Sequence, residues 1–198
     1  MSDNHRRIAY VRHSETEGVL RIGVRYLSEV VSHTVSAYAY PEATELAVGD
    51  ILDEEAYALL LRAEEEYRAR RRALSLLALS DNNEKTLKMK LVAKGTSRDI
   101  AEDVCRRMVE LGYIDEKRQL RRIISAEANG KMCGPKKIYA RLLAKGYSSS
   151  DIRLVMAELT ESGEVDFERL AGELIAKNYP DGANYDEKMK LLYKHGYK

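Results

Sequence analysis

The feature that most constrains the fold is a repeat with a spacing of 51 residues in the second half of the chain. A gap-free shift by 51 residues aligns LVAKG, ending at Gly95, with LLAKG, ending at Gly146, and the identities continue at Gly112 and Gly163. A shorter third copy contains KMKL at 188–191, which repeats the KMKL of 88–91. Self-similarity at one fixed spacing of this length is typical of arrays of stacked helical units.

Each copy has the pattern of three helices. In the second copy, Asp115 opens a helix that Asn129-Gly130 closes, Gly134-Pro135 starts another, and a serine at 148–150 caps the last. Proline in a first turn and glycine just after a last turn are ordinary helix signals. The first copy repeats two of these helices over 84–94 and 98–111, whereas the third copy lacks its last helix.

The segment ahead of the repeats has a different pattern. Residues 19–26 alternate apolar and basic side chains, which predicts a strand, and 30–31 and 35–40 could supply pairing strands. Asp53 is then expected to cap a long helix that runs to Leu79.

The expected fold class is therefore mainly α, with tandem three-helix repeats forming an elongated curved array and a small N-terminal β-containing segment. The expected divisions are 1-52 for the strands, 53-115 for the long helix and first repeat, 116-165 for the second repeat and 166-198 for the third.

No pattern in the sequence indicates catalysis. There is no phosphate-binding G-x-x-x-x-G-K-[ST] loop and no G-x-S-x-G elbow, and the four histidines are scattered without metal-ligand spacing. We therefore expect no catalytic residues, no cofactor, no bound metal and no enzymatic activity.

Several features indicate a cytoplasmic protein. Cys105 and Cys133 show no disulfide pattern and are expected to be reduced. Residues 1–7 lack the apolar run of a secretory signal, and no window approaches the roughly 18 apolar residues of a membrane span.

The formal net charge of +1 hides an uneven distribution. Residues 1–66 carry 6 basic and 13 acidic side chains, whereas 117–145 carry nine basic side chains against one acid, Glu127. A strongly basic middle in a near-neutral protein predicts an anionic partner.

The spacing of the basic residues suggests where that partner binds. Lys137, Arg141 and Lys145 follow each other at four-residue intervals, on one face of a helix, and lysines recur at the equivalent places in the other copies. For a single helix, the simpler interpretation is a solvated face; recurrence in three copies favours a binding stripe, which would suit phosphates or acidic protein surfaces. The predicted partner-binding residues, here called the basic stripe, are Lys90, Lys94, Arg118, Arg121, Arg122, Lys131, Lys136, Lys137, Arg141, Lys145, Lys190 and Lys194.

Taken together, the Lys-Gly-[Tyr/Thr]-Ser caps, the Gly-Tyr-Ile-Asp and Gly-Glu-Val-Asp turns and the Gly-Pro-Lys-Lys-Ile helix start resemble the RecX family of recombination regulators. The resemblance covers about residues 70–198. It departs from the family where Glu116-Lys117 stands in place of the aromatic residue that usually packs beneath the turn and that Phe167 supplies in the next copy. The residues that carry it are Leu91, Lys94, Gly95, Val104, Leu111, Gly112, Ile114, Asp115, Gly134, Pro135, Ile138, Leu142, Lys145 and Gly146.

The resemblance implies a monomeric regulator in DNA repair, recombination and the SOS response that lies in the groove of the RecA–DNA filament. It would bridge neighbouring protomers, limit filament growth and suppress the ATPase and strand exchange of RecA. It would need no cofactor and no membrane, and it could touch the backbone of single- or double-stranded DNA.

Two alternatives stay open. The chain could be an autonomous, non-sequence-specific nucleic-acid-binding helical repeat protein, whose affinity for bare DNA would fall steeply with salt. It could also be a passive scaffold for another protein.

Overall fold

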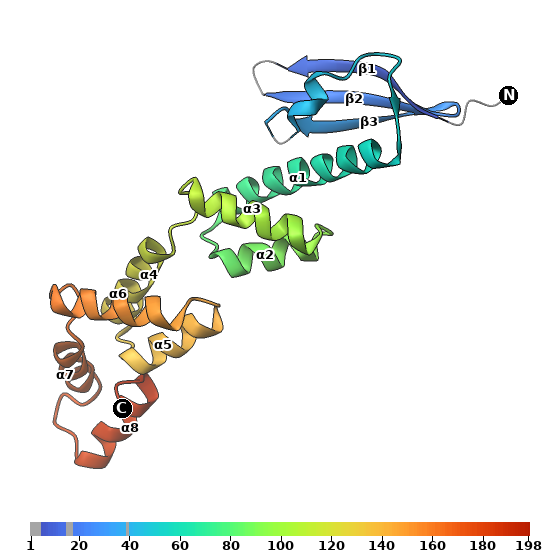
Figure 1. Ribbon diagram of the computed structural model, residues 1–198. Coiled ribbons are helices and arrows are strands. Elements are labelled where there is room, and N and C mark those ends of the chain that lie inside the picture. The colour runs from blue at the N-terminus through green and yellow to red at the C-terminus, as the bar shows by residue number, and fades with distance from the viewer. Residues whose placement is uncertain (1–4, 15–17, 39) are drawn as a thin grey trace. The chain divides into compact units, whose positions relative to one another are not determined.

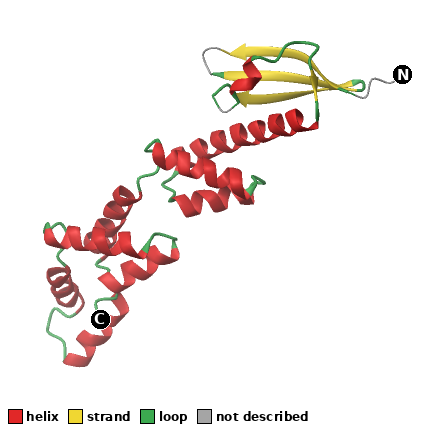
Figure 2. Cartoon of the chain, viewed as in Figure 1, coloured by secondary structure: helices red, strands yellow, loops and turns green. Residues whose placement is uncertain are grey.

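In a computed structural model, residues 5–14, 18–38 and 40–198 are described, and they form a four-stranded sheet and eight α-helices (Figures 1 and 2). The mainly helical fold with an N-terminal β segment is as predicted. The chain divides into two compact units, one of residues up to 80 together with 87–108, the other of 81–86 together with 109–198. The prediction that no secretory signal is present rests in part on residues 1–4, which lie outside the described residues. Within the described ranges, none of the helices has the length and apolar character needed to cross a membrane.

The sheet is antiparallel, with the order β3-β2-β1-β4. Its strands are β1 (Arg6–Ser14), β2 (Val19–Tyr26), β3 (Glu29–Ser36) and β4 (Ile51–Leu52). The strand predicted over 19–26 is β2. The sequence did not predict β1, because the register shifts between Ile8 and Tyr10 and interrupts the alternation.

The predicted strand over 35–40 is wrong beyond Ser36, where β3 ends. Residue 39 lies outside the described residues. The Tyr40 N–H donates to the Ser36 carbonyl, and Pro41 begins the short 3-10 helix η1 (Pro41–Thr44). Proline has no N–H to add to a ladder but suits the first turn of a helix, so the chain turns here.

Helix α1 (Glu54–Leu79) packs against the sheet in the first unit. As predicted, Asp53 caps it, accepting from the Ala56 N–H at 2.8 Å. The buried side chains Leu60 and Ala63 join Ile22 and Val35 in one core. This unit also holds residues 87–93 of α2 (Glu84–Ala93) and 98–108 of α3 (Arg98–Glu110), each one residue shorter than predicted.

A buried polar contact joins β3 to α1. The side chains of His33 and Glu64 are only 3% and 9% exposed, and His33 Nδ1 lies 2.8 Å from Glu64 Oε2. The other carboxylate oxygen of Glu64 accepts from the Thr34 N–H at 3.4 Å and from Arg68 at 2.6 Å. One carboxylate thus satisfies donors from both the strand and the helix.

The second unit contains α4 (Glu116–Ser125), η2 (Ala126–Gly130), α5 (Pro135–Ala144), α6 (Ser149–Glu161), α7 (Phe167–Asn178) and α8 (Tyr185–His195). Displacing the bounds of α2 and α3 by 51 residues gives the bounds of α5 and α6. The predicted caps Asp115 and Ser148 accept from backbone N–H groups, as does Asp166 on α7. The helix after Asp115 ends at Gly130 as predicted, but its last turn widens into the π-helical η2, with the Cys133 N–H donating to the Glu127 carbonyl.

The core of the second unit is one continuous apolar cluster. It includes Leu120 and Ile124 from α4, Ile138 from α5 and Ile152 and Val155 from α6, each essentially inaccessible to solvent. The spacing of these residues is the 3–4 residue period of a helix with one buried face.

A hydrogen-bonded chain also fixes residues 81–86 within this unit. The buried Tyr147 hydroxyl donates to Gln119 Oε1 at 2.9 Å, and Gln119 Nε2 donates to the Asn82 carbonyl at 3.2 Å. The Asn83 amide donates to the Lys145 carbonyl at 3.0 Å. Burial raises the pKa of the Tyr147 hydroxyl, which therefore stays protonated and able to donate.

We predict that Glu64→Leu lowers the free energy of unfolding by about 2 kcal/mol, because it leaves the buried His33 and Thr34 groups without their acceptor. Urea denaturation measures this change. The control is Glu66→Leu, which places the same side chain on the same helix at a less buried position. Equal destabilisation by the two variants would contradict the role given to Glu64.

Candidate partner-binding surface

The basic stripe is distributed over both units. Lys90 lies on α2 and Lys94 just after it, in the first unit, where the Lys94 carbonyl accepts from Arg72. The remaining members belong to the second unit: Arg118, Arg121 and Arg122 on α4, Lys131 after η2, Lys136, Lys137 and Arg141 on α5, Lys145 at the end of α5, and Lys190 and Lys194 on α8. Side chains of this set are exposed, apart from Lys90 and Lys137, which are half-buried.

Many of these cations have carboxylate partners that the sequence did not reveal. Arg121 lies 2.6 Å from Glu158 and 3.8 Å from Glu164 on and after α6. Arg122 pairs with Asp81, which precedes α2 in the sequence. The acids lie 37 to 43 residues away in the sequence, and folding brings them next to these arginines. They neutralise part of the excess positive charge of 117–145.

Glu127 is the centre of the second group of ion pairs. Its side chain is 15% exposed, lies 2.5 Å from Lys131 Nζ and also pairs with Arg141. The hydrogen bond from Lys131, with that from Arg141, holds the pKa of Glu127 below its usual range, and the same carboxylate raises the pKa of Arg141. The single acid of the basic segment therefore holds two of its cations in place.

Glu127 also lines a hollow of about 420 Å³ with an apolar floor and a basic rim. Ile138 and Leu142 contribute apolar surface, whereas Lys131, Arg141 and Lys145 contribute charge. The row Lys137–Arg141–Lys145 predicted from the sequence thus continues into this hollow. Apolar surface beside unneutralised charge suits a partner with an acidic group next to an apolar one.

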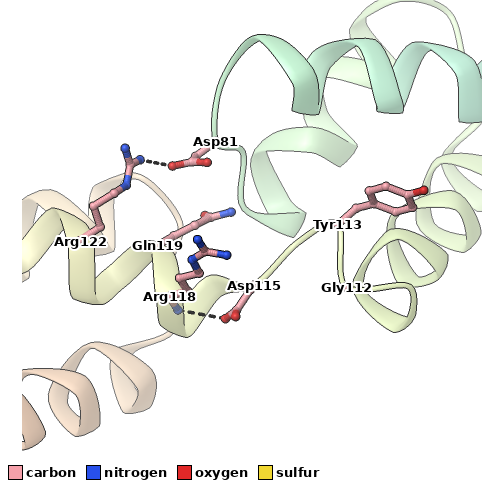
Figure 3. Close-up of a pocket in the computed structure, with 7 residues that line it drawn as sticks. All are labelled: Asp81, Gly112, Tyr113, Asp115, Arg118, Gln119 and Arg122. Atoms are coloured by element: carbon pink, nitrogen blue, oxygen red, sulfur yellow. Dashed lines mark hydrogen bonds and ion pairs between the residues drawn. The ribbon is translucent and has the colours of Figure 1, made fainter.

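Arg118 and Arg122 line a different hollow, of about 360 Å³, shown in Figure 3. There Asp115 caps α4 by accepting from the Arg118 N–H at 2.9 Å, and Arg122 pairs with Asp81. Two carboxylates stand here beside two guanidinium groups, so this hollow has a balanced charge. Arg118 and Arg122 of α4 thus line a different hollow from Arg141 and Lys145.

The first turn of α5 meets the last turn of α8 (Figure 1). The Gly134 N–H donates to the His195 carbonyl at 2.7 Å, and the Lys136 N–H to the Gly196 carbonyl at 3.0 Å. A Cβ at Gly134 would collide with the backbone of Gly196, so glycine is needed for this close approach.

This contact brings cations of two repeat copies together. Lys137 Nζ donates to the Lys194 carbonyl at 3.2 Å, so the basic residues that begin α5 adjoin those that end α8. Among the described residues, no carboxylate forms an ion pair with Lys136, Lys145, Lys190 or Lys194. The same holds for Lys94, Arg118 and Lys137, so these residues together are the part of the basic stripe whose charge no ion pair with a described residue compensates.

The described part of the chain contains no group of three or more side chains arranged to hold a metal ion. Cys105 and Cys133 are both buried, each within one unit, and neither forms a disulfide. The groups that the basic stripe offers to a partner are ammonium and guanidinium groups.

Comparison with known proteins gives consistent matches. The chain is 32% identical over 139 residues to "Regulatory protein RecX" of Salmonella paratyphi C (strain RKS4594), a match that covers 62% of the chain and 81% of that protein. It is 26% identical over 153 residues to the protein of the same name from Clostridioides difficile (strain 630), covering 75% and 68%. No protein-family model matches the chain.

Solved structures show the same fold. A crystal structure of regulatory protein RecX superposes with a TM-score of 0.75 at 20% identity, covering 98% of the chain and 95% of that structure. RecX from Lactobacillus salivarius gives a TM-score of 0.57 at 22% identity, covering 69% and 90%.

We predict that Glu127→Gln lowers the free energy of unfolding by about 1 kcal/mol at pH 7, because Lys131 and Arg141 lose a charged partner. A carboxylate whose pKa is lowered by folding stabilises the protein above its unfolded pKa and ceases to do so as pH falls through its folded pKa. The difference between wild type and variant should therefore shrink between pH 7 and about pH 3.

Urea denaturation across this pH range measures the effect, and Glu161→Gln, an exposed position on α6, is the control. A difference that does not change with pH would show that the charge of Glu127 is not what stabilises the pair.

Proposed function

Because the chain belongs to the RecX family of regulatory proteins, we propose that it binds the RecA–DNA filament in its groove and inhibits the RecA ATPase, filament growth and strand exchange. The observation that carries this proposal is the 32% identity over 81% of a curated regulatory relative. The uncompensated lysines of α5 and α8 support it, since they offer positive charge to a partner that is acidic or exposes phosphates.

The contact surface that we propose is the basic stripe, with Lys136, Lys145, Lys190 and Lys194 as its most available members. Charges that already have carboxylate partners are less free to bind, because the partner would have to replace an existing ion pair. Arg121, Arg122 and Arg141 are in that position. In this proposal they orient the surface, while the lysines bind.

We propose further that the divisions 53-115, 116-165 and 166-198 act as tandem units that present equivalent cations along one extended, curved surface. The contact between α5 and α8 supports this idea for the second and third copies, since it joins Lys137 to Lys194. An extended row of charges would let one monomer span neighbouring protomers of a filament.

We predict that Lys136→Glu/Lys145→Glu abolishes inhibition of the DNA-dependent ATPase of RecA while leaving helix content unchanged. These positions are preferable to Arg141, whose reversal would place two carboxylates together at Glu127. Steady-state ATPase assays with circular dichroism measure both effects. Inhibition by a folded double variant at wild-type concentrations would contradict the assignment of this surface.

The matched control is Lys177→Glu/Lys188→Glu, which makes the same charge change at exposed positions outside the stripe. It should inhibit as the wild type does. An electron micrograph of RecA filaments with and without the wild-type chain tests the proposed function itself, because unaltered filaments would contradict it whichever surface is used. Tight binding to bare DNA without any effect on RecA would instead favour the autonomous nucleic-acid-binding alternative.

A further inference from the structure

The N-terminal sheet has a basic face that the proposed function does not use. Ile8, Leu20, Ile22 and Val24 point toward α1 and are buried in the core. Since side chains alternate along a strand, the residues between them point to the opposite face. Four arginines lie there, which we call the arginine face: Arg7 and Arg12 on β1, and Arg21 and Arg25 on β2.

The register of the sheet places these arginines directly opposite one another. Arg7 pairs with Arg25, and Arg12 pairs with Arg21, across the antiparallel ladder of β1 and β2. Opposed residues have Cβ atoms about 5 Å apart, and like charges at this spacing destabilise a sheet. The Arg12–Arg21 pair works against folding, so folding alone gives no reason for it.

No acidic side chain offsets this charge within the strands. Among the described residues of β1 to β4, Glu29 at the start of β3 is the only one with a carboxylate. It lies opposite Tyr26, whose place in the alternation of β2 puts both residues on the face of the sheet toward α1. Arg6, on that side, shows the contrast: it lies 2.5 Å from Glu54 and stacks on Tyr57. Arg12, Arg21 and Arg25 are exposed, and no ion pair joins them to another described residue.

Between the two arginine pairs, the face carries an aromatic ring. Tyr10 is opposite Gly23, and a Cβ at Gly23 would collide with the Tyr10 ring, so the ring lies directly against the strand. The Arg12 guanidinium stands 5.0 Å from the centre of that ring. Glycine thus permits an aromatic platform that supports a guanidinium group.

We propose that the arginine face binds the phosphodiester backbone of a single-stranded nucleic acid. Guanidinium groups match phosphate oxygens in a planar, two-bond geometry. Arg21 and Arg25 are about 13 Å apart along β2, at about 3.3 Å per residue, so the charges form a ladder that suits a linear polyanion better than one small anion. A sheet face that carries an aromatic ring and cations is a surface typical of single-strand binding.

The composition of the face argues against a protein partner. Protein interfaces usually have an apolar centre surrounded by a polar rim. Here the centre is Tyr10, Gly23 and Ser32, surrounded by arginines, and the exposed apolar residues Val30 and Ile51 lie on the outer strands. This binding site is independent of RecA and of the basic stripe.

The test is Arg12→Gln/Arg21→Gln in the full chain, with a labelled oligothymidylate of about 20 nucleotides in a salt series without RecA. The affinity should fall at least tenfold at low salt. The slope of log affinity against log salt should fall by about 1.4, since each lost single-strand phosphate contact accounts for about 0.7. The thermal midpoint should stay the same or rise, because a repulsive pair is removed.

The control is Arg98→Gln/Arg106→Gln on α3, which removes the same charge from the same unit and should bind as the wild type does. The measurement is repeated in a chain carrying Lys136→Glu/Lys145→Glu, where the same loss should appear. If Arg12→Gln/Arg21→Gln fails to fold, Arg21→Gln/Arg25→Gln replaces it and leaves the contact of Arg12 with Tyr10 intact.

Unchanged affinity and salt slope in the folded variant would overturn the proposal. The proposal would also fail if a duplex of the same length bound as tightly as the oligothymidylate and lost as much affinity in the arginine variant. It would fail too if polyglutamate, at the same concentration of charge, competed as well as unlabelled oligothymidylate. Inhibition of RecA is measured separately, and its result does not bear on this site.

Discussion

The structure of the second unit depends on the burial of one apolar stripe from each helix. Ile124, Ile138 and Ile152 can share a core only if the charged side chains of α4, α5 and α6 occupy the remaining surface. The packing that stabilises the fold therefore places the nine cations of 117–145 close to one another on the remaining surface. Acids brought from elsewhere in the sequence, such as Asp81 and Glu158, relieve that crowding where they reach.

The unequal reach of these acids divides the basic surface into two kinds of charge. Arg121 and Arg122 on α4 and Arg141 on α5 are held in ion pairs, whereas Lys136, Lys145 and Lys194 have no such partner among the residues that the structure describes. Exposed ion pairs contribute little stability each, but they fix the direction of long side chains. A partner that approaches this surface thus meets ordered arginines beside lysines that are free to adjust.

Local signals in the sequence predicted most of the fold. Asp53 and Asp115 cap the helices that they were expected to cap, and of the three candidate serines at 148–150 Ser148 is the cap, because capping needs only neighbouring backbone atoms. The bulge in β1 was missed because it depends on pairing with another strand. The end of β3 was missed although its cause is local, since the Tyr40 N–H donates back to the Ser36 carbonyl just before Pro41.

For the candidate surface, helix spacing predicted that Arg141 and Lys145 share one row, and both side chains line one hollow. It could not show that Arg122 would turn to Asp81, since that ion pair spans 41 residues. Nor could alternation in β2 alone reveal the arginine pairs, because the register that opposes Arg12 to Arg21 is set by the fold of the sheet.

The arginine face and the basic stripe have different physical characters, and this difference bears on how one chain would hold a filament of protein and DNA. The sheet offers guanidinium groups in a repulsive array that an anion stabilises, whereas the helices offer ammonium groups beside apolar surface. Two weak contacts on one chain reinforce each other, because the first raises the effective concentration of the second. If both proposed contacts are made, each could be weak and salt-sensitive by itself, and the chain would be retained where protein and nucleic acid are present together and released where only one is.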